Sequence, residues 1–258
     1  MDTPVDPAAR RARLAGHLFL LAFLAVWLAY SSVVDSYVMP GPWAVAERLW
    51  QMLGDVHEVK HMLYSFAHII AAVAISFVIG SALAFLAHYL SITEHAVHGR
   101  LSPFLNSFSG IGWTFLAIIW FGISDVTVVF VISMVLIPFA IINMREGLNN
   151  LDRERLEMAA SFSRSGWRRF WLVVLPSLLP FIFATIRISF GVAWKVALTA
   201  ELFGGNTGLG YLLNLARQDF DMPLVIGVII IIVAFVYTSD RFVFAPIQAA
   251  LARHHGVS

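Results

Sequence analysis

Long apolar stretches alternate along this chain with shorter polar segments. A helix needs about 20 mostly apolar residues to cross the roughly 30 Å hydrocarbon core of a membrane. Six stretches approach or meet this requirement, at 14–30, 63–90, 103–123, 126–143, 171–200 and 224–237. Only the fifth contains charged side chains, Arg187 and Lys195. The pattern therefore predicts an all-α, polytopic membrane protein with about six transmembrane helices.

The composition supports this interpretation and excludes several functions. Of the 258 residues, 59% are hydrophobic and 13% are charged, whereas soluble domains carry about 25% charged residues. The mean hydropathy is +0.80. A formal net charge of +1 gives no electrostatic case for a nucleic-acid partner. The sequence has no cysteine, which excludes disulfides, thiolate metal sites and a cysteine nucleophile.

Basic residues are distributed unequally between the two sides of the predicted spans. With the amino terminus inside, twelve of the 17 Lys and Arg residues lie on the inner side, three lie outside and two lie within the fifth span. Positive residues are retained on the cytoplasmic side of membranes. We therefore expect both termini to be cytoplasmic.

Two loops of this topology have helical patterns of their own. In the first outer loop, Pro40-Gly41-Pro42 precedes apolar residues at helical spacing, with Trp43 and Trp50 suited to the headgroup region, so we expect a helix along the outer membrane surface. In the inner loop, Asn150 is a suitable helix cap, and a stripe of mainly small residues follows at Leu156, Ala159, Ala160 and Ser163. From spacing alone this inner helix is either a docking element or a basic anchor that contacts lipid.

The inner loop also resembles a motif of a known family. Glu157-Met158-Ala159, Trp167, Phe170 and Val173-Val174-Leu175-Pro176 resemble the EAA loop of bacterial ABC-importer permeases, which inserts into a cleft of the ATPase. Further segments are similar to the nitrate/sulfonate/taurine branch: Met39-Pro40-Gly41-Pro42, Trp120-Phe121-Gly122, Ala193-Trp194, Ala200-Glu201 and Gly205-Asn206-Thr207-Gly208-Leu209-Gly210-Tyr211. The matches follow the family's order over residues 39–246. The chain thus resembles the inner membrane component of a binding-protein-dependent transport system.

The resemblance implies a type I ABC importer permease fold in one domain over residues 1–258, with the ABC transmembrane domain at 59–244 and the coupling loop at 145–169. Met158 stands where the family usually has alanine, and Ser163 where it usually has glycine. The residues implied to couple to the ATPase are Glu157, Met158, Ala159, Ala160, Ser163 and Gly166.

The resemblance also implies partners. No Gly-x-x-x-x-Gly-Lys-[Ser/Thr] loop occurs in the sequence, so the usual phosphate-binding nest for ATP is absent. The chain would be a non-catalytic permease subunit of the bacterial inner membrane, without a cofactor of its own. It would form a homodimer with a second permease copy, and two ATPase subunits would bind ATP and Mg. A periplasmic or lipid-anchored binding protein would deliver the solute.

Charged residues within a span usually face the protein interior or an aqueous path. At about 100° per residue, Arg187, Trp194, Lys195 and Glu201 fall on one broad face of the fifth span. Two cations there would favour an anionic solute such as nitrate, a sulfonate, taurine or bicarbonate. The alternative is structural: Lys195 pairs with Glu201, and Arg187 satisfies carbonyls freed by Pro176 and Pro180 or holds helices together.

The glycine-rich segment Gly204–Gly210 follows a span and not a strand, so it does not fit a dinucleotide-binding fingerprint. We expect a short helix after it, at 211–215. The resemblance gives Asn206, Gly208 and Gly210 a candidate role as an outer gate, with an ordinary turn as the alternative.

Two other functions are compatible with single motifs. His57, Glu58 and His61 form a literal His-Glu-x-x-His, the zinc-binding pattern of metalloproteases, but the sequence offers no identifiable third ligand. His68 and His88 in the second span would suit proton relay in a self-sufficient proton-coupled transporter or channel. More often such histidines bond to neighbouring helices, and Ala72, Gly80 and Ala84 give this span small surfaces for close packing.

Overall fold

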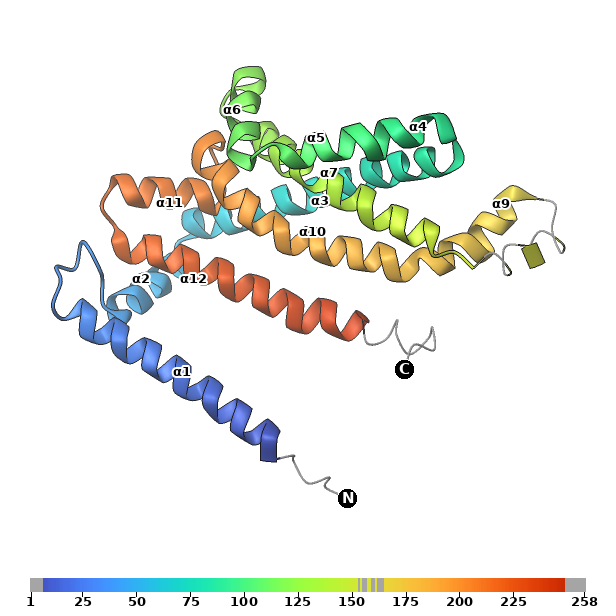
Figure 1. Ribbon diagram of the computed structural model, residues 1–258. Helices are drawn as coiled ribbons and strands as arrows, with labels where there is room; N and C mark the ends of the chain where they lie inside the picture. Colours follow the sequence, from blue (N-terminus) through green and yellow to red (C-terminus); the bar gives the residue numbers. More distant parts are fainter. Residues whose placement is uncertain (1–6, 153, 155–156, 159–160, 162–164, 249–258) are drawn as a thin grey trace. The chain divides into compact units, whose positions relative to one another are not determined.

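A computed structural model describes residues 7–152, 154, 157–158, 161 and 165–248, with side chains from residue 15 onward except that of His17. Within these ranges every regular element is helical, which confirms the all-α prediction (Figure 1). The α-helices are α1 (Pro7–Ser31), α2 (Pro42–Gly54), α3 (Val56–Tyr89), α4 (Ser91–Ala96), α5 (Ser102–Ser107), α6 (Gly110–Phe121), α7 (Asp125–Asn149), α9 (Gly166–Arg169), α10 (Leu175–Gly204), α11 (Leu209–Gln218) and α12 (Met222–Ser239). Three π-helical turns lie at Val97–Leu101, Phe170–Val174 and Asp240–Phe244.

Four helices in the described part of the chain are long and apolar enough to cross a membrane: Val56–Tyr89, Asp125–Asn149, Gly166–Gly204 and Met222–Gln248. A bent pair, Ser91–Ser107 and Gly110–Phe121, makes a fifth span if it is counted as one. Leu18–Ser31 is a shorter apolar helix. These segments correspond in order to the six predicted stretches, and α2 and α11 correspond to the helix predicted in the first outer loop and to the one predicted at 211–215.

The third predicted span is not one straight helix. Its two parts meet at an angle of 88°. Phe108 and Ser109 adopt extended backbone conformations (ψ 127° and 143°), which ends α5 before α6 begins. Helix α6 has only 12 residues and ends at Gly122, whose φ is +70°, a conformation that favours glycine. At about 1.5 Å per residue, α6 alone is too short to cross a membrane.

By its internal contacts the chain divides into two compact units. One contains residues 1–59 and 213–230, and the other contains residues 60–212 and 231–258. A single permease domain over residues 1–258 stays a prediction. The candidate sites described below each lie within one unit.

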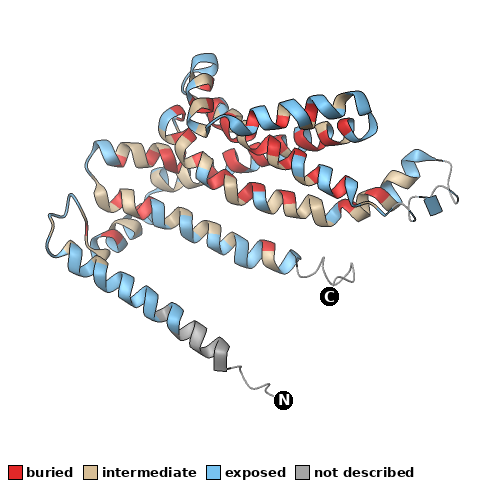
Figure 2. Ribbon diagram, in the orientation of Figure 1, coloured by how far each residue is buried: buried red, intermediate tan, exposed pale blue. Residues whose placement is uncertain are grey.

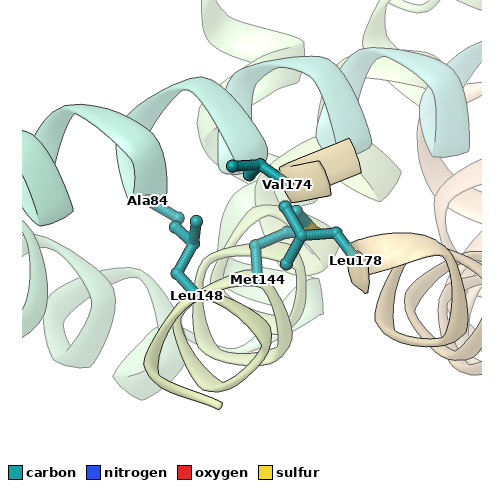
Figure 3. Packing of buried hydrophobic residues seen from close by; sticks show 5 residues of the cluster. All are labelled: Ala84, Met144, Leu148, Val174 and Leu178. Atoms are coloured by element: carbon teal, nitrogen blue, oxygen red, sulfur yellow. The ribbon is translucent and has the colours of Figure 1, made fainter. Parts of the chain in front are cut away.

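The larger unit is built by close packing of small residues. A Cβ atom on Gly80 of α3 would lie 2.5 Å from Cβ of Ala140 on α7, and one on Gly147 of α7 would lie 2.8 Å from the Phe181 ring on α10. Larger side chains at these glycines would force the helices apart. The adjoining core contains Ala84, Met144, Leu148, Val174 and Leu178 (Figure 3). The small surfaces predicted for the second span are therefore confirmed as packing surfaces.

The smaller unit is held by polar contacts around α2. Val45 and Met52 form the buried side of this helix, whereas Trp43 and Trp50 are 82% and 79% exposed. The Arg48 guanidinium donates to both carboxylate oxygens of Glu58 at 2.9 and 2.5 Å, and its Nε donates to Asp221 at 2.7 Å. Hydrogen bonding to Glu58 raises the pKa of Arg48 further above its ordinary high value. Helix α1, in contrast, exposes most of its described side chains (Figure 2).

Candidate functional site

Helix α10 separates the four residues that the sequence places on one face. Arg187 and Lys195 line an open groove. Trp194 and Glu201 are 3% and 1% exposed and do not line it. The structure therefore brings together only the two cations, and it contradicts the expectation that all four residues share one face toward a path.

The groove lies between α10 and the segment formed by the end of α12 and the following helical turns. Its volume is about 710 Å³. Apolar side chains, among them Phe183, Phe190 and Phe244, form most of the lining. The charged groups that line it are Arg187, Lys195 and Asp240. A groove of this kind excludes water along its walls while presenting a few charges to a ligand.

Arg187 is held by two side chains from the segment after α12. Its Nε donates to Asp240 Oδ1 at 2.8 Å, its Nη2 donates to Oδ2 at 3.1 Å, and its Nη1 donates to Gln248. Arg187 therefore forms a bidentate pair with the Asp240 carboxylate and, within the described part of the chain, does not bind the carbonyls freed by the prolines. Sequence reasoning does not single out Asp240 or Gln248. The available cue is that a span arginine requires an acidic partner, and Asp240 directly follows a long apolar helix.

Lys195 is exposed in the groove and has no ion-pair partner among the described residues. Glu201, the partner suggested by the structural alternative, is bound elsewhere. Six residues along a helix correspond to a rotation of about 120° between side chains, which explains why the two groups do not meet. The Lys195–Glu201 pairing is therefore wrong, and among the described residues Lys195 is the groove cation without an ion-pair partner.

Trp194 packs into the aromatic interior of the larger unit. Its ring lies 6.2 Å from that of Phe190 and 5.0 Å from that of Phe235, measured between centroids. Its indole Nε1 has no hydrogen-bond partner among the described residues. This position supports helix packing and not a place in the groove lining.

Glu201 forms the centre of a second polar region, which we call the Glu201 cluster: Ser65, His68, Asp125 and Glu201. Ser65 Oγ donates to Glu201 Oε2 at 2.7 Å. His68 Nδ1 lies 3.0 Å from Glu201 Oε1, and His68 Nε2 lies 3.4 Å from Asp125 Oδ1. Sequence reasoning considered His68 as a relay or a packing residue, but it missed Ser65 and Asp125, because their partners are distant in sequence.

The glycine-rich segment Gly204–Gly210 lies against this cluster. Gly210 N–H donates to Glu201 Oε2 at 2.9 Å. Gly208 has φ +100°, and a Cβ atom there would overlap the Glu201 carboxylate. Asn206 is exposed. The two glycines predicted as gate residues therefore have definite packing roles: Gly208 leaves room for the buried Glu201 carboxylate, and Gly210 leaves room for the α10 backbone at Leu198.

The predicted coupling loop is described in part. Glu157, Met158 and Ser161 are helical and exposed, and Gly166 begins α9, where Ser165 caps the helix by accepting from Arg168 N–H. Ala159, Ala160 and Ser163 lie outside the described residues. Asn150 does not begin the coupling helix: it ends α7, and its amide donates to the Glu146 carbonyl at 2.9 Å. Beyond it, Asp152 Oδ1 accepts from Glu154 N–H at 3.0 Å.

The His-Glu-x-x-His motif does not form a metal centre in the described residues. Glu58, the base of the zinc hypothesis, has both carboxylate oxygens bound to Arg48. No group of three or more His, Asp or Glu side chains placed to hold a metal ion occurs in the described part of the chain. In this structure Glu58 of the motif is therefore engaged by Arg48.

Comparison with known proteins shows which family and which known structure this chain is similar to. Residues 95–248 match the family model of the binding-protein-dependent transport system inner membrane component. A chain of the MetNI methionine ABC transporter, solved in inward-facing conformations, superimposes with a TM-score of 0.65 at 15% identity, over 75% of this chain and 95% of that one. That likeness shows a shared ABC permease fold.

Relatives in sequence extend over most of the chain. SsuC of Escherichia coli (strain K12), named as a candidate aliphatic sulfonates transport permease protein, is 28% identical over 90% of this chain and 88% of its own length. The taurine transport system permease protein TauC of the same strain is 26% identical over 97% and 92%. The riboflavin transport system permease protein RibX of Chloroflexus aurantiacus is 26% identical over 80% and 77%.

The family match settles the choice between the functions that the sequence left open. Permeases of this family are multi-pass inner membrane proteins, and they work with an ATPase and a solute-binding protein. Neither a zinc protease nor a self-sufficient transporter fits this match. The chain belongs to the inner membrane components of binding-protein-dependent transport systems, and it is the non-catalytic permease subunit of an ABC importer.

Proposed function

We propose that this permease translocates a small anionic solute of the nitrate, sulfonate, taurine or bicarbonate type. The observation that carries the proposal is the apolar groove of about 710 Å³ with the cations Arg187 and Lys195 in its lining. Cationic donors in a partly dry groove bind oxyanions through charge-assisted hydrogen bonds. The names of TauC and SsuC agree with a sulfonate-type solute. RibX is named for a different solute, so the anion rests on the groove more than on the relatives.

Lys195 is the principal solute contact in this proposal. Arg187 has its charge balanced by Asp240 in a bidentate pair, whereas Lys195 faces the groove without a partner among the described residues. An anion entering the groove would therefore meet the Lys195 ammonium first. Arg187 would contribute after exchanging Asp240 for the solute.

The proposed assembly is a homodimer in which the groove of each copy faces the other. A second copy would complete the wall that the open groove lacks and would enclose a path between the two α10 helices. Two ATPase subunits would bind ATP and Mg, and a periplasmic or lipid-anchored binding protein would deliver solute on the opposite side of the membrane. The distribution of basic residues supports cytoplasmic termini in this arrangement.

Coupling would occur through the loop at 145–169. Glu157 and Met158 are exposed and helical, as expected for a surface that enters a cleft of the ATPase. Closure of the ATPases on ATP would move this loop and tilt the attached helices α7 and α10. In a reconstituted complex, Glu157→Ala is expected to uncouple ATP hydrolysis from uptake while subunit assembly is retained. Full coupling in this variant would remove Glu157 from the contact.

The solute proposal is tested with the chain's two lysines, Lys60 and Lys195. The permease is reconstituted in proteoliposomes with its ATPase and binding protein, and uptake of labelled taurine, ethanesulfonate, nitrate and bicarbonate is measured. Lys195→Ala and Arg187→Ala are expected to lower uptake by about tenfold or more, since one charged hydrogen bond contributes that much. Lys60→Ala, an exposed lysine outside the groove lining, is the matched control. Normal uptake in both groove variants would refute the anion path.

A further inference from the structure

Four consecutive residues of the glycine-rich segment are each bound to a different side chain of the larger unit. The partners come from α3, from the first residue of α7 and from α10. Thr207 Oγ1 donates to Asp125 Oδ1 at 2.6 Å, Gly208 N–H to His61 Nδ1 at 3.2 Å, Leu209 N–H to Ser65 Oγ at 2.7 Å, and Gly210 N–H to Glu201 Oε2 at 2.9 Å. Leu209 and Gly210 open α11, so two of these contacts satisfy amides that have no partner within that helix, and the Thr207 and Gly208 contacts extend the set into the preceding turn.

The Glu201 carboxyl group depends on these contacts. It is 1% exposed, and a buried carboxylate is costly unless hydrogen-bond donors surround it. Two of its donors are Ser65 Oγ and Gly210 N–H, and Ser65 in turn accepts from Leu209. Withdrawal of the segment would remove one donor from Glu201 directly and would leave the Ser65 hydroxyl without its own donor.

His68 extends the same network to α7. Its two ring nitrogens face carboxylate oxygens of Glu201 and Asp125 at 3.0 and 3.4 Å. Asp125 then accepts from Thr207. The contacts form a closed circuit that begins and ends in the segment.

We propose that the Glu201 cluster is a latch that holds the glycine-rich segment closed and that transport requires its release. Glu201, His68, Asp125 and Ser65 are positioning residues in this mechanism: they act through the segment and not on the solute. Because the contacts share acceptors, loss of one weakens the others, which gives the segment two discrete states. The inference rests on the proposed importer function and deepens the candidate outer-gate role that the family resemblance gives Asn206, Gly208 and Gly210.

Hydrogen exchange reads the latch directly, because three of its donors are the backbone amides of Gly208, Leu209 and Gly210. In the complete transporter, exchange of peptides covering these amides is compared without nucleotide and with a non-hydrolysable ATP analogue plus loaded binding protein. We expect protection in the first state and a loss of about tenfold or more in the second. Equal protection in both states, with normal ATP-driven uptake, would overturn the latch and leave a permanent anchor.

Glu201→Gln tests the same point by function. The substitution keeps the shape of the side chain but directs amide protons toward neighbouring donors. We expect faster hydrogen exchange at the three amides when no nucleotide is bound. We also expect ATP hydrolysis in the absence of binding protein to rise by about tenfold, the factor that corresponds to losing one charged hydrogen bond. Thr185→Val is the matched control, since it removes a buried hydroxyl of α10 whose one hydrogen bond within the described part of the chain is to the Phe181 carbonyl of the same helix. Coupled uptake and unchanged exchange in Glu201→Gln would refute the proposal.

Two further readouts keep the result interpretable. If Glu201→Gln fails to assemble, Ser65→Ala removes a single hydroxyl of the same circuit and is expected to show the same change to a smaller extent. If the wild-type complex takes up none of the tested solutes, the proposed solute class fails, while exchange at the three amides still decides whether the segment is released on ATP binding.

Discussion

The groove and the Glu201 cluster both involve helix α10, but they differ in how far their charged side chains are exposed. In the groove, the side chains of Arg187 and Asp240 are 32% and 52% exposed. In the cluster, Glu201 and His68 have side chains that are 1% and 5% exposed, whereas Asp125 at its edge is 48% exposed. An exposed ion pair contributes about 0–1 kcal/mol, whereas breaking a buried pair costs about 3–5 kcal/mol. One helix thus offers exchangeable charges in its groove and fixed charges near its end.

The largest expected effect distinguishes two glycines in these regions. Gly208→Ala places a methyl group on the Glu201 carboxylate at a residue with φ +100°, so backbone strain of about 1–3 kcal/mol adds to the overlap. We expect little assembled transporter on size-exclusion chromatography. Gly191→Ala lies in the groove lining, where a Cβ atom meets nothing within 4 Å, and is expected to assemble normally. Equal yields of assembled transporter for the two variants would contradict the distinction between the Glu201 cluster and the groove.

Removing one charge from each region should separate stability from transport. Glu201→Ala leaves His68 and Ser65 without their shared acceptor, and we expect a loss of about 3–5 kcal/mol, visible as a lower melting temperature of the purified protein. Lys195→Ala should leave the melting temperature unchanged and reduce uptake. The reverse outcome would exchange the roles assigned to the two regions.

A smaller effect is expected for the partner of Arg187. Asp240→Asn removes a half-exposed carboxylate and should leave the melting temperature of the purified protein nearly unchanged. Because the substitution frees Arg187 for solute, the concentration of anion needed for half-maximal uptake should fall. Phosphate-free uptake titrations measure this change, and a large drop in melting temperature would show that the pair is structural.

Ionic strength should have the smallest effect and should act on the groove alone. Raising salt from about 0.05 to 0.5 M shortens the range of charge interactions several-fold at exposed sites. We therefore expect a related anion to compete a few-fold less effectively for uptake at the higher salt concentration. The hydrogen-exchange protection of the amides at 208–210 should not change. Salt-dependent exchange at those amides would contradict the enclosed character of the cluster.

The helices were predictable from sequence because their apolar stretches are long and their packing residues are small. The break near Phe108 and Ser109 was not, because it depends on local backbone angles within an otherwise apolar stretch. Asn150 illustrates a similar limit: it is suited to begin a helix, but α7 extends to Asn149 and the Asn150 side chain bonds back to Glu146.

The candidate site was predictable in its residue types more than in its geometry. A helical wheel places Arg187 and Glu201 within one broad sector, but it does not show which helices cover that sector. The contacts of Glu201 with Ser65 and His68 span 136 and 133 residues of sequence, and that of Arg187 with Asp240 spans 53. No local pattern encodes such pairs, because they arise only when the helices pack.

The turn at Asp240–Phe244 shows how groove composition depends on chain register. A π-helical turn accommodates an extra residue within an otherwise α-helical course. In a homologue lacking that residue, the following helix would rotate by about 100°, and the residue equivalent to Gln248 would no longer point at the arginine. A single-residue insertion or deletion at this point would therefore change which side chains face the groove while leaving the identity of each residue unchanged.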